Sequence, residues 1–313
     1  MPTFSTVTLN PALDKTMFFR DEFLMGGLNR AVCSVTEAGG KGINVSRVLK
    51  RFGADAVCFG FVGGRSGRTL CDLLDLADIP YRFTHTLAET RTCVKLRDDY
   101  SVTEANEAGG PVSEGEKRNL LRSLDRSAGD IVCLSGSLPH GLPPETLPEL
   151  IALLKKKGRV VAVDTSGEAL AAALDASPDL IKPNEHELAR LIGRRAETET
   201  ELVDACTAIY EKHQTAVLCT LGGEGAVYVG KDGIFSVPAS PVRQVKNTVC
   251  AGDTFLAAFL FAYYGEGEHR SDPVYALSLA SSAAGAKTEK EGTEIPTREE
   301  LGQYLDCVPV RKL

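Results

Sequence analysis

Short apolar runs alternate with longer helical stretches along the whole chain, and this alternation constrains the fold more than any other feature. It favours a layered α/β domain built around a mostly parallel sheet. The candidate central strands are residues 4–9, 56–62, 130–135, 159–164, 178–182 and 215–220. The helical patterns cover residues 42–52, 67–77, 114–126, 144–157 and 185–192. The sequence shows no repeat and no low-complexity linker, so we expect residues 1–313 to form a single domain.

Two regions interrupt this rhythm. Residues 15–36 and 81–105 carry β-type alternation, with no helical pattern evident between their strands. Such strands need another place to pair, so we expect a small β-sheet that projects from the main domain as a lid or a dimer surface. The alternative is that these strands extend the main sheet.

Composition narrows the partners and the compartment. The formal charge of −7 comes with no long block of Lys or Arg, so neither a nucleic acid nor an anionic membrane is an expected partner. The nine cysteines form no C-x-x-C pair and several lie in apolar runs, which indicates reduced core cysteines. No apolar run approaches the roughly 18 residues that span a bilayer, and the start of the chain lacks a basic leader region. We therefore expect a cytoplasmic protein.

The strongest local motif is residues 247–254, which an apolar helical run follows at once. The small residues Ala251 and Gly252 allow a ligand to approach the backbone, and N–H groups at a helix start point toward it. This pattern predicts an anion-binding turn that contains the carboxyl group of Asp253. In isolation, an acid in such a turn is better explained as a simple helix cap, and only the motifs elsewhere in the sequence favour a binding role.

A second motif, residues 38–46, places three glycines around Lys41 before a helical stretch. Glycines permit close contact with a polar ligand, while Lys41 and Asn44 offer donors to hydroxyl or phosphate oxygens. The motif also fits a plain turn with a cap. It does not match the G-x-x-x-x-G-K-[ST] pattern of a P-loop.

Two further segments follow candidate strands, where ligands gather in open α/β sheets. Asn184 and Glu187 are three residues apart, so they share a helical face and could orient the waters of Mg²⁺, although capping explains Asn184 as well. The Gly-rich bend at residues 220–226 fits either a receiver of nucleotide phosphates or a tight hairpin.

Taken together and in order, four motifs closely resemble those of the ribokinase-like (PfkB) carbohydrate kinases. They are Gly39-Gly40-Lys41-Gly42-Ile43-Asn44, Lys182-Pro183-Asn184-x-x-Glu187, Thr220-Leu221-Gly222-x-x-Gly225 and Ala251-Gly252-Asp253. Other segments are similar to the branch of 1-phosphofructokinases and tagatose-6-phosphate kinases, which includes the minor 6-phosphofructokinase. They are Leu9–Asp14, Asn29-Arg30, Thr90-Arg91, Thr103–Glu107 and Ser135–Pro139.

The resemblance implies a three-layer α/β/α core with a small β-sheet lid, often paired across a homodimer. It implies ATP-dependent phosphorylation of a ketohexose phosphate to a bisphosphate, first of all fructose 1-phosphate to fructose 1,6-bisphosphate. Tagatose-6-phosphate kinase and 6-phosphofructokinase activities are alternatives in the same family. A kinase of an unphosphorylated sugar or nucleoside, or a sugar-phosphate sensor without turnover, also stays open.

The resemblance also assigns roles to individual residues. Asp253 would be the catalytic base, with stabilising N–H groups around Cys250, Ala251 and Gly252. Sugar hydroxyls would be held by Asp14, Gly39, Gly40 and Asn44. The substrate phosphate would be held by Lys41, by Arg91, and by Arg30 of a partner chain, with Ser137 assisting. The nucleotide would contact Lys182, Asn184, Thr220, Gly222 and Gly225, and Mg²⁺ would be supported by Glu187 and Asn184 through water.

Two positions depart from the family pattern. Cys250 stands where the family usually has glycine, and a positive φ there would cost about 1 kcal/mol, with the thiol expected to face the interior. Cys93 stands where relatives in this branch often carry Asn, which leaves the identity of the sugar open. We also expect the Asp253 carboxyl to be ionised at neutral pH, because nearby donors and cations should outweigh its desolvation.

Overall fold

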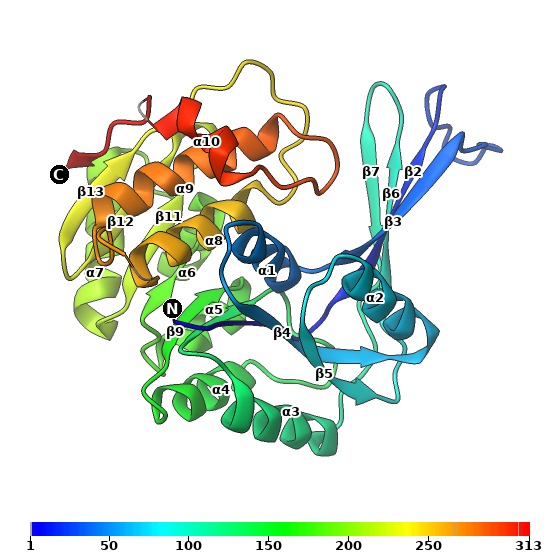
Figure 1. The fold of residues 1–313 in the computed structure, drawn as a ribbon, viewed down its shortest axis with the longest axis horizontal. Helices are drawn as coiled ribbons and strands as arrows, with labels where there is room; N and C mark the ends of the chain where they lie inside the picture. The colour runs from blue at the N-terminus through cyan, green and yellow to red at the C-terminus, as the bar shows by residue number, and fades with distance from the viewer. Residues whose placement is uncertain (1, 266, 306) are drawn as a thin grey trace.

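A computed structural model describes residues 2–265, 267–305 and 307–313. Its main feature is a ten-stranded sheet in a layered α/β arrangement (Figure 1). In spatial order the strands are β14 (Arg311–Lys312), β13 (Gly233–Val237), β12 (Ala226–Gly230), β11 (Ala216–Thr220), β10 (Leu180–Ile181), β9 (Val160–Asp164), β8 (Ile131–Ser135), β1 (Phe4–Thr8), β4 (Ala56–Gly63) and β5 (Tyr81–Thr86). Strands β11 to β5 in this order pair in parallel, whereas β12, β13 and β14 pair antiparallel at one edge. The expected mostly parallel sheet is confirmed.

Helices cover both faces of this sheet. One hydrophobic core lies against α1 (Lys41–Arg51), α8 (Ala251–Tyr264), α9 (Pro273–Thr288) and α10 (Arg298–Leu305). The other lies against α3 (Glu114–Ser127), α4 (Thr146–Lys155), α5 (Gly167–Leu174), α6 (Glu185–Ile192) and α7 (Glu199–His213). A smaller core joins α2 (Gly64–Leu76) to β4 and to the segment around Ala38.

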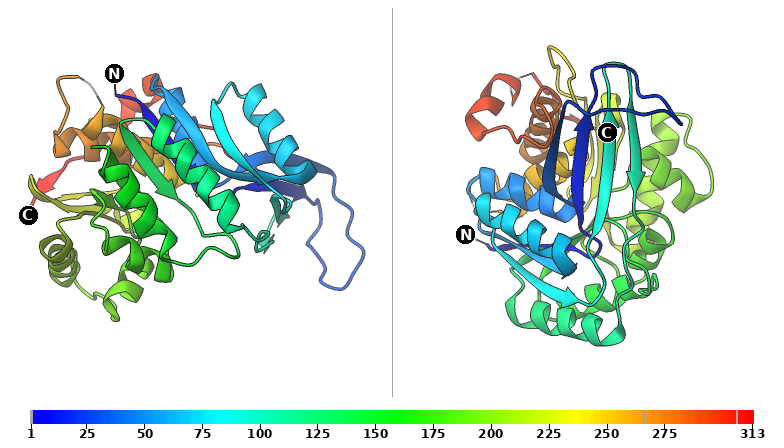
Figure 2. Two further views of the ribbon diagram at one scale, coloured as in Figure 1. Left: turned by 90° about the horizontal axis from the view of Figure 1, so that it is seen from below. Right: turned by 90° about the vertical axis from the view of Figure 1, so that its right-hand side faces the viewer.

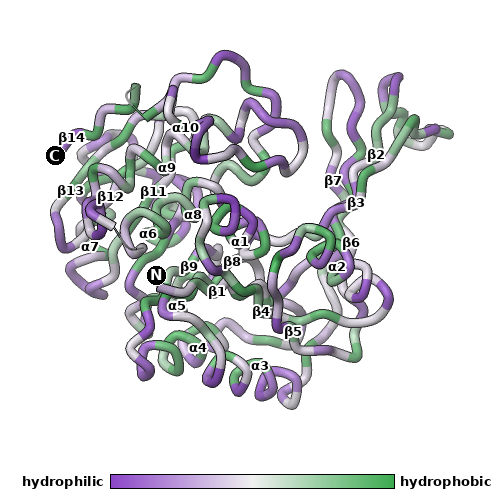
Figure 3. Tube along the Cα trace, in the orientation of Figure 1, coloured by the Kyte–Doolittle hydropathy of each residue, from purple (hydrophilic) through white to green (hydrophobic). Residues whose placement is uncertain are grey.

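This covering explains why the strands are continuous apolar runs. Within β8, Cys133 contributes to one core, while Val132 and Leu134 contribute to the other. A strand buried on both faces needs apolar residues at every position, as parallel strands in α/β proteins do. The hydropathy tube shows the same pattern, with apolar central strands and polar outer helices and loops (Figure 3).

A second, four-stranded sheet projects from this body (Figures 1 and 2). Its order is β3 (Cys33–Gly39), β2 (Ala12–Phe18), β6 (Arg91–Arg97) and β7 (Val102–Asn106). Strand β2 pairs antiparallel with β3 and parallel with β6. We call it the small sheet. Residues 81–105 were expected to contribute only to a projecting sheet. Residues 81–86 instead form β5, which pairs in parallel with β4 and extends the main sheet.

The reason is local. Helix α2 lies between β4 and β5, so the two strands form a parallel unit with a helical crossover. Only the next strand, β6, pairs with β2 of the small sheet.

Among the residues that the structure describes, none belongs to a helix with the length and hydropathy required to cross a membrane.

Candidate active site

Most of the predicted site residues gather beyond the carboxyl ends of the parallel strands, where the N-termini of α1 and α8 also lie. Strand β9 ends at Asp164 and β11 ends at Thr220, while Lys182 follows β10 directly. This edge is where an open α/β sheet binds its ligands.

Asp253 is the centre of this group. It lies in the first turn of α8 and is 8% exposed, and its Oδ2 accepts a hydrogen bond of 2.8 Å from Asn44 Nδ2. Asn44 lies in the first turn of α1. Two motifs that are 209 residues apart in the sequence therefore meet through one hydrogen bond.

The electrostatic environment of Asp253 differs from expectation. Burial, together with the nearby carboxylate of Asp164, raises the pKa of Asp253 to about 6, although Asn44, Lys41 and Lys182 act in the opposite direction. The expectation that donors and cations would outweigh desolvation was wrong, because the carboxyl group is too deeply buried. The ionised form still predominates at neutral pH, so the group remains able to accept a proton.

Asp164 was missed by the sequence analysis. It is fully buried. Its Oδ1 lies 2.9 Å from Lys41 Nζ, and its Oδ2 lies 3.3 Å from Lys182 Nζ. Burial alone would raise the pKa of Asp164, but Lys182 and Lys41 hold it below its usual value. One buried carboxylate thus fixes two cations that belong to different motifs. The available signal was an acid as the last residue of an apolar strand.

The turn that precedes Asp253 has unusual backbone geometry. Cys250 has φ 65° and ψ 1°, which is left-handed, so the anticipated strain of about 1 kcal/mol applies. Its side chain is half-buried, and burial raises the pKa of the thiol to about 12, so it stays protonated. The N–H of Ala251 already donates to Thr248 O at 3.2 Å. The first-turn N–H groups of Gly252 and Asp253 are the ones that fit the predicted anion-binding role.

The small sheet supplies the side of the site opposite the nucleotide motifs. In its register Asp14 lies beside Cys93, so both share a face with Lys95, whose Nζ is 3.9 Å from Asp14 Oδ2. Burial raises the pKa of Asp14, and Lys95 opposes this rise. Lys95 is a second residue that the sequence analysis did not select; its place two residues from Cys93 on a strand was the available signal.

Two glycines allow the backbone to pass close to this face. A Cβ on Gly39 would stand 2.4 Å from the carboxyl carbon of Asp14. Gly40 has φ 131°, a conformation that side chains rarely adopt, and caps α1. The sequence Gly39-Gly40 therefore brings Asp14 and the start of α1 together.

The other residues predicted to bind the sugar phosphate differ in what their side chains contact. Arg91 donates from Nε to Asn10 O and from Nη1 to Glu107 O, both at 3.1 Å, so its guanidinium is held by main-chain oxygens. Ser137 accepts a 3.3 Å hydrogen bond from Asn10. Arg30 is exposed in the connection between β2 and β3, and within the described residues it makes no hydrogen bond or ion pair with the other site residues.

The nucleotide-side predictions converge on one cavity of about 390 Å³. The predicted residues that line it are Asn184, Thr220, Gly222, Gly225, Ala251 and Gly252. The far wall, which sequence reasoning missed, comes from Val242, Phe255, Ser281, Ala284 and Gly285. Lys182 lies at its inner end, since a Cβ on Gly252 would be 3.8 Å from Lys182 Nζ. A largely apolar cavity with a cation at one end suits a flat ring with an anionic tail.

Asn184 and Glu187 form a reciprocal helix cap. Asn184 Oδ1 accepts from Glu187 N at 2.8 Å, and Glu187 Oε2 accepts from Asn184 N at 2.9 Å. The capping interpretation is correct, and it leaves Oε1 of Glu187 for another partner. Within the described ranges there is no group of three or more His, Cys, Asp or Glu able to hold a metal ion. One carboxylate with waters and a substrate phosphate is nevertheless the usual donor set of Mg²⁺, so these residues fit that ion.

The Gly-rich bend at residues 220–226 is a tight hairpin that also borders the cavity. Strands β11 and β12 form an antiparallel hairpin, and the 3-10 turn Gly222–Glu224 joins them. Gly222 and Gly225 of the same bend line the cavity.

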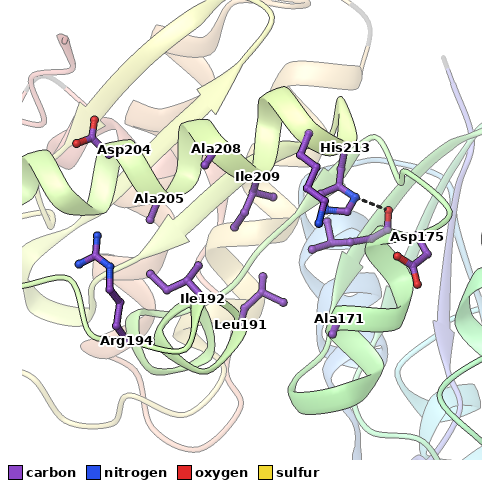
Figure 4. Close-up of a pocket in the computed structure, with 12 residues that line it drawn as sticks. Ala171, Asp175, Leu191, Ile192, Arg194, Asp204, Ala205, Ala208, Ile209 and His213 are labelled. Carbon is purple, nitrogen blue, oxygen red and sulfur yellow. Dashed lines mark hydrogen bonds between the residues drawn. The ribbon is translucent and has the colours of Figure 1, made fainter.

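A separate cavity of about 510 Å³ lies among helices α5, α6 and α7 (Figure 4). Its lining includes Ile192, Arg194, Ile209 and His213, and His213 Nδ1 is 3.0 Å from Leu174 O. It contains none of the predicted site residues, so we do not assign it to the active site.

The pattern of the pfkB family carbohydrate kinases matches residues 7–300. The chain belongs to this family. The 1-phosphofructokinase of Bacillus subtilis (strain 168) is 34% identical over 309 residues, which cover 98% of this chain and 99% of the relative.

Solved structures agree. The phosphofructokinase-2 from Escherichia coli in complex with fructose-6-phosphate has a TM-score of 0.88 at 27% identity, covering 98% of this chain and 99% of that one. The tetrameric inhibited form of the same enzyme has a TM-score of 0.88 at 28% identity, with the same coverage. The predicted family and ribokinase-like fold are confirmed. This PfkB chain is a sugar kinase, a phosphotransferase with an alcohol group as acceptor.

Proposed function

We propose that this PfkB kinase transfers the terminal phosphoryl group of ATP to a hydroxyl of a ketohexose phosphate, with fructose 1-phosphate as the first candidate. The observation that carries the proposal is the position of Asp253. Its carboxyl group is hydrogen-bonded to Asn44 at the start of α1, and the neighbouring Gly252 lines the nucleotide cavity. Donor and acceptor would therefore meet at this carboxylate.

The acceptor side carries more positive charge than a neutral sugar needs. Lys41, Arg91 and Lys95 all lie there, and the side chain of Lys41 is 41% exposed although it pairs with Asp164. Guanidinium and ammonium groups are the usual ligands of phosphate oxygens. These cations favour a phosphorylated sugar over a free sugar or a nucleoside.

The residues suggest a simple sequence of roles. Asp14 and Asn44 would orient the sugar, and Asn44 also fixes the carboxylate of Asp253 for proton transfer. Asp253 accepts the proton of the attacking hydroxyl as the phosphoryl group leaves the nucleotide. Lys182 and the first-turn N–H groups of α8 stabilise the negative charge on the transferred group.

Mg²⁺ would be held by the remaining oxygen of Glu187 and, through water, by Asn184. When bound, it supplies positive charge to the phosphate oxygens of the nucleotide. Thr220 and Gly222 line the same cavity as Asn184, and they would contact the phosphates directly.

The choice of sugar rests on relatives. Curated relatives that cover nearly the whole chain are named 1-phosphofructokinase, which supports fructose 1-phosphate. The solved neighbour that binds fructose-6-phosphate supports 6-phosphofructokinase as the alternative. Tagatose 6-phosphate remains in the set, since it differs from fructose 6-phosphate at one stereocentre.

A second copy of this chain is the proposed partner. The small sheet and its connections expose the apolar side chains of Leu24, Met25, Leu28, Val32 and Val35, a surface suited to pairing with another small sheet. Such a homodimer would bring Arg30 near a neighbouring site. We also place the protein in the cytoplasm, because the reaction uses ATP and all nine cysteines are free thiols.

The first test is ADP release with Mg-ATP across fructose 1-phosphate, tagatose 6-phosphate, fructose 6-phosphate and free fructose. We expect turnover on one phosphosugar, and a loss of at least about a hundredfold in Asp253→Asn, because the amide cannot accept the proton. Asp232→Asn is the matched control, since Asp232 accepts a hydrogen bond from Tyr263 at the other end of α8. It should keep its turnover.

Turnover on fructose alone would remove the phosphorylated substrate from the proposal. Binding of phosphosugars without any ADP release would instead indicate a sensor. Full activity of Asp253→Asn would remove Asp253 as the base.

A further inference from the structure

Lys287 carries a basic group that the mechanism above does not use, and it is fully buried. It lies in the last turn of α9 and has 0% of its surface exposed. Burying a lysine is costly unless its amino group finds partners, so its contacts identify what it holds.

These contacts lead to the catalytic turn. Lys287 Nζ donates to Gly292 O at 3.0 Å, and Asn247 Nδ2 donates to the same oxygen at 3.0 Å. Asn247 Oδ1 in turn accepts from Val249 N at 2.9 Å, directly before Cys250. Thr288 O accepts from the backbone N–H groups of residues 246 and 247 as well. The end of α9, the loop at 289–294 and segment 246–249 thus form one hydrogen-bonded unit.

The same loop contacts the acceptor side of the site. Arg47 Nη1 donates to Thr293 Oγ1 at 3.2 Å, and Thr293 donates to Glu37 of the small sheet. Arg47 follows Asn44 by one helical turn, and Asn44 is the hydrogen-bond partner of Asp253. Both the turn that bears Asp253 and the helix that orients it are therefore attached to the loop that Lys287 fixes.

Lys287 and the thiol of Cys250 in the turn also affect each other's pKa. Burial lowers the pKa of Lys287, and Cys250, Glu294, Glu37 and Glu291 oppose this shift. Lys287 likewise lowers the pKa of the Cys250 thiol against the stronger effect of burial. Lys287 and Cys250 are thus electrostatic neighbours, in agreement with the hydrogen bonds that join the end of α9 to this turn.

We propose that Lys287 is a positioning residue for phosphoryl transfer: through Gly292 and Asn247 it holds the 246–253 turn in its catalytic geometry. The inference rests on the proposed function. It concerns kcat and not affinity for the sugar phosphate, because Lys287 touches neither the acceptor face nor the nucleotide cavity.

Lys287→Met tests it. We expect kcat to fall by about 30-fold or more, with the KM of the sugar phosphate within about threefold, because Lys287 does not contact the acceptor face. The KM of ATP can rise as well, because Ala251 and Gly252 of the turn line the nucleotide cavity. The melting temperature should not fall, because methionine fills the space without a desolvation cost and Gly292 O keeps Asn247 as a donor. Amide hydrogen exchange of residues 246–254 should become faster.

Lys290→Met is the matched control. It removes a lysine three residues away that pairs with Glu300 and Glu294 and does not contact the 246–249 segment. Its kcat and the exchange of the turn should stay unchanged. Lys287→Ala with added propylammonium is the second variant, because the amine replaces the missing part of the side chain; partial recovery of kcat is expected, and none in Lys290→Ala.

A kcat of Lys287→Met within about threefold of the unaltered chain overturns the proposal. Unchanged hydrogen exchange at residues 246–254 would overturn it as well. Failure of both Lys287 variants to fold would also overturn it, because Lys287 would then contribute to stability alone. If the unaltered chain shows no turnover on any sugar, the proposed function fails, and the exchange measurement still decides whether Lys287 holds the turn.

Discussion

At the scale of single residues, the site is governed by the balance between burial and charge. Asp253 and Asp164 are both buried carboxyl groups, yet burial raises the pKa of the first, and two lysines lower the pKa of the second. The two acids are thereby separated into one that can exchange a proton near neutral pH and one that stays ionised. This separation is typical of groups with different roles in one site.

The raised pKa of Asp253 predicts a pH dependence. Its folded-state pKa of about 6 lies above the ordinary value of 3.8, so the carboxyl binds protons more readily in the folded chain. Turnover should therefore fall as the pH drops through about 6, where the base becomes protonated.

Stability should follow the opposite direction. The contribution of this group to stability is fully present below the unfolded pKa and is lost as the pH rises through about 6. Asp253→Asn should thus raise the melting temperature at pH 8 relative to the unaltered chain, and change it little at pH 4. The charged groups that face Asp253 are Asp164, Lys41 and Lys182. A melting temperature of Asp253→Asn that is lower at pH 8 would contradict the burial cost.

Cys250 predicts a second outcome at this scale. With φ 65°, the position accepts glycine without strain, so Cys250→Gly should keep or raise the melting temperature and leave turnover within about tenfold. Gln214→Gly is the matched control, since Gln214 has φ 53° at the end of α7 and lies outside the site. A larger loss of turnover in Cys250→Gly alone would show that the thiol contributes to catalysis.

At the scale of elements, sequence patterns predicted the central strands and most helices of the core, because buried strands are uniformly apolar and helices such as α1 have one apolar face. They failed where the pattern carries no periodicity or where pairing is decided by the rest of the chain. Helix α9 is apolar on nearly all sides, so nothing in its sequence indicated that it forms the far wall of the nucleotide cavity. Strand β5 alternates like β6, and only its neighbour α2 assigns it to the main sheet.

The same limit applies to the site. Motifs identified Asp253, Asn44 and Lys182, whose residue types stand out in Gly-rich or helix-start contexts. Asp164 and Lys95 were missed, because each is an ordinary residue of a strand until the fold places it beside another motif.

The link between β3 and α1 predicts a contrast between two neighbouring glycines. Gly39→Ala would push against the flexible carboxyl group of Asp14, so it should raise KM for the sugar phosphate by about tenfold or more with little loss of stability. Gly40→Ala would force a side chain into φ 131° and bring its Cβ to 2.7 Å from Thr8 Cγ2, so it should lower the melting temperature. Steady-state kinetics and thermal unfolding of both variants check this. Equal effects on KM would contradict the special proximity of Gly39 to Asp14.

At the scale of the whole molecule, the active site is a meeting of distant segments. The proposed acceptor side comes from residues 10–107 together with Ser137, and the nucleotide cavity from residues 184–288. The hydrogen bond between Asn44 and Asp253 joins the two. The small sheet stands apart from the body, with apolar side chains that the chain itself does not cover.

This exposed surface predicts assembly. Leu24→Asp combined with Leu28→Asp should shift the protein from dimer to monomer in sedimentation velocity, because two buried carboxylates at an apolar interface are strongly unfavourable. Leu76→Asp, on a still more exposed leucine of α2, is the control. If the unaltered protein is a monomer, the proposed homodimer is wrong. If it is a tetramer, a second interface is present beside the proposed one.

The order of the site residues along the chain has a consequence for synthesis on the ribosome. The segments of the acceptor side leave the exit tunnel first, while Lys182, the nucleotide cavity and Asp253 follow later. The proposed base, Asp253, is therefore absent from a growing chain until residue 253 has been added. On the proposed function, a chain that ends before residue 253 therefore lacks the group that would activate the sugar hydroxyl.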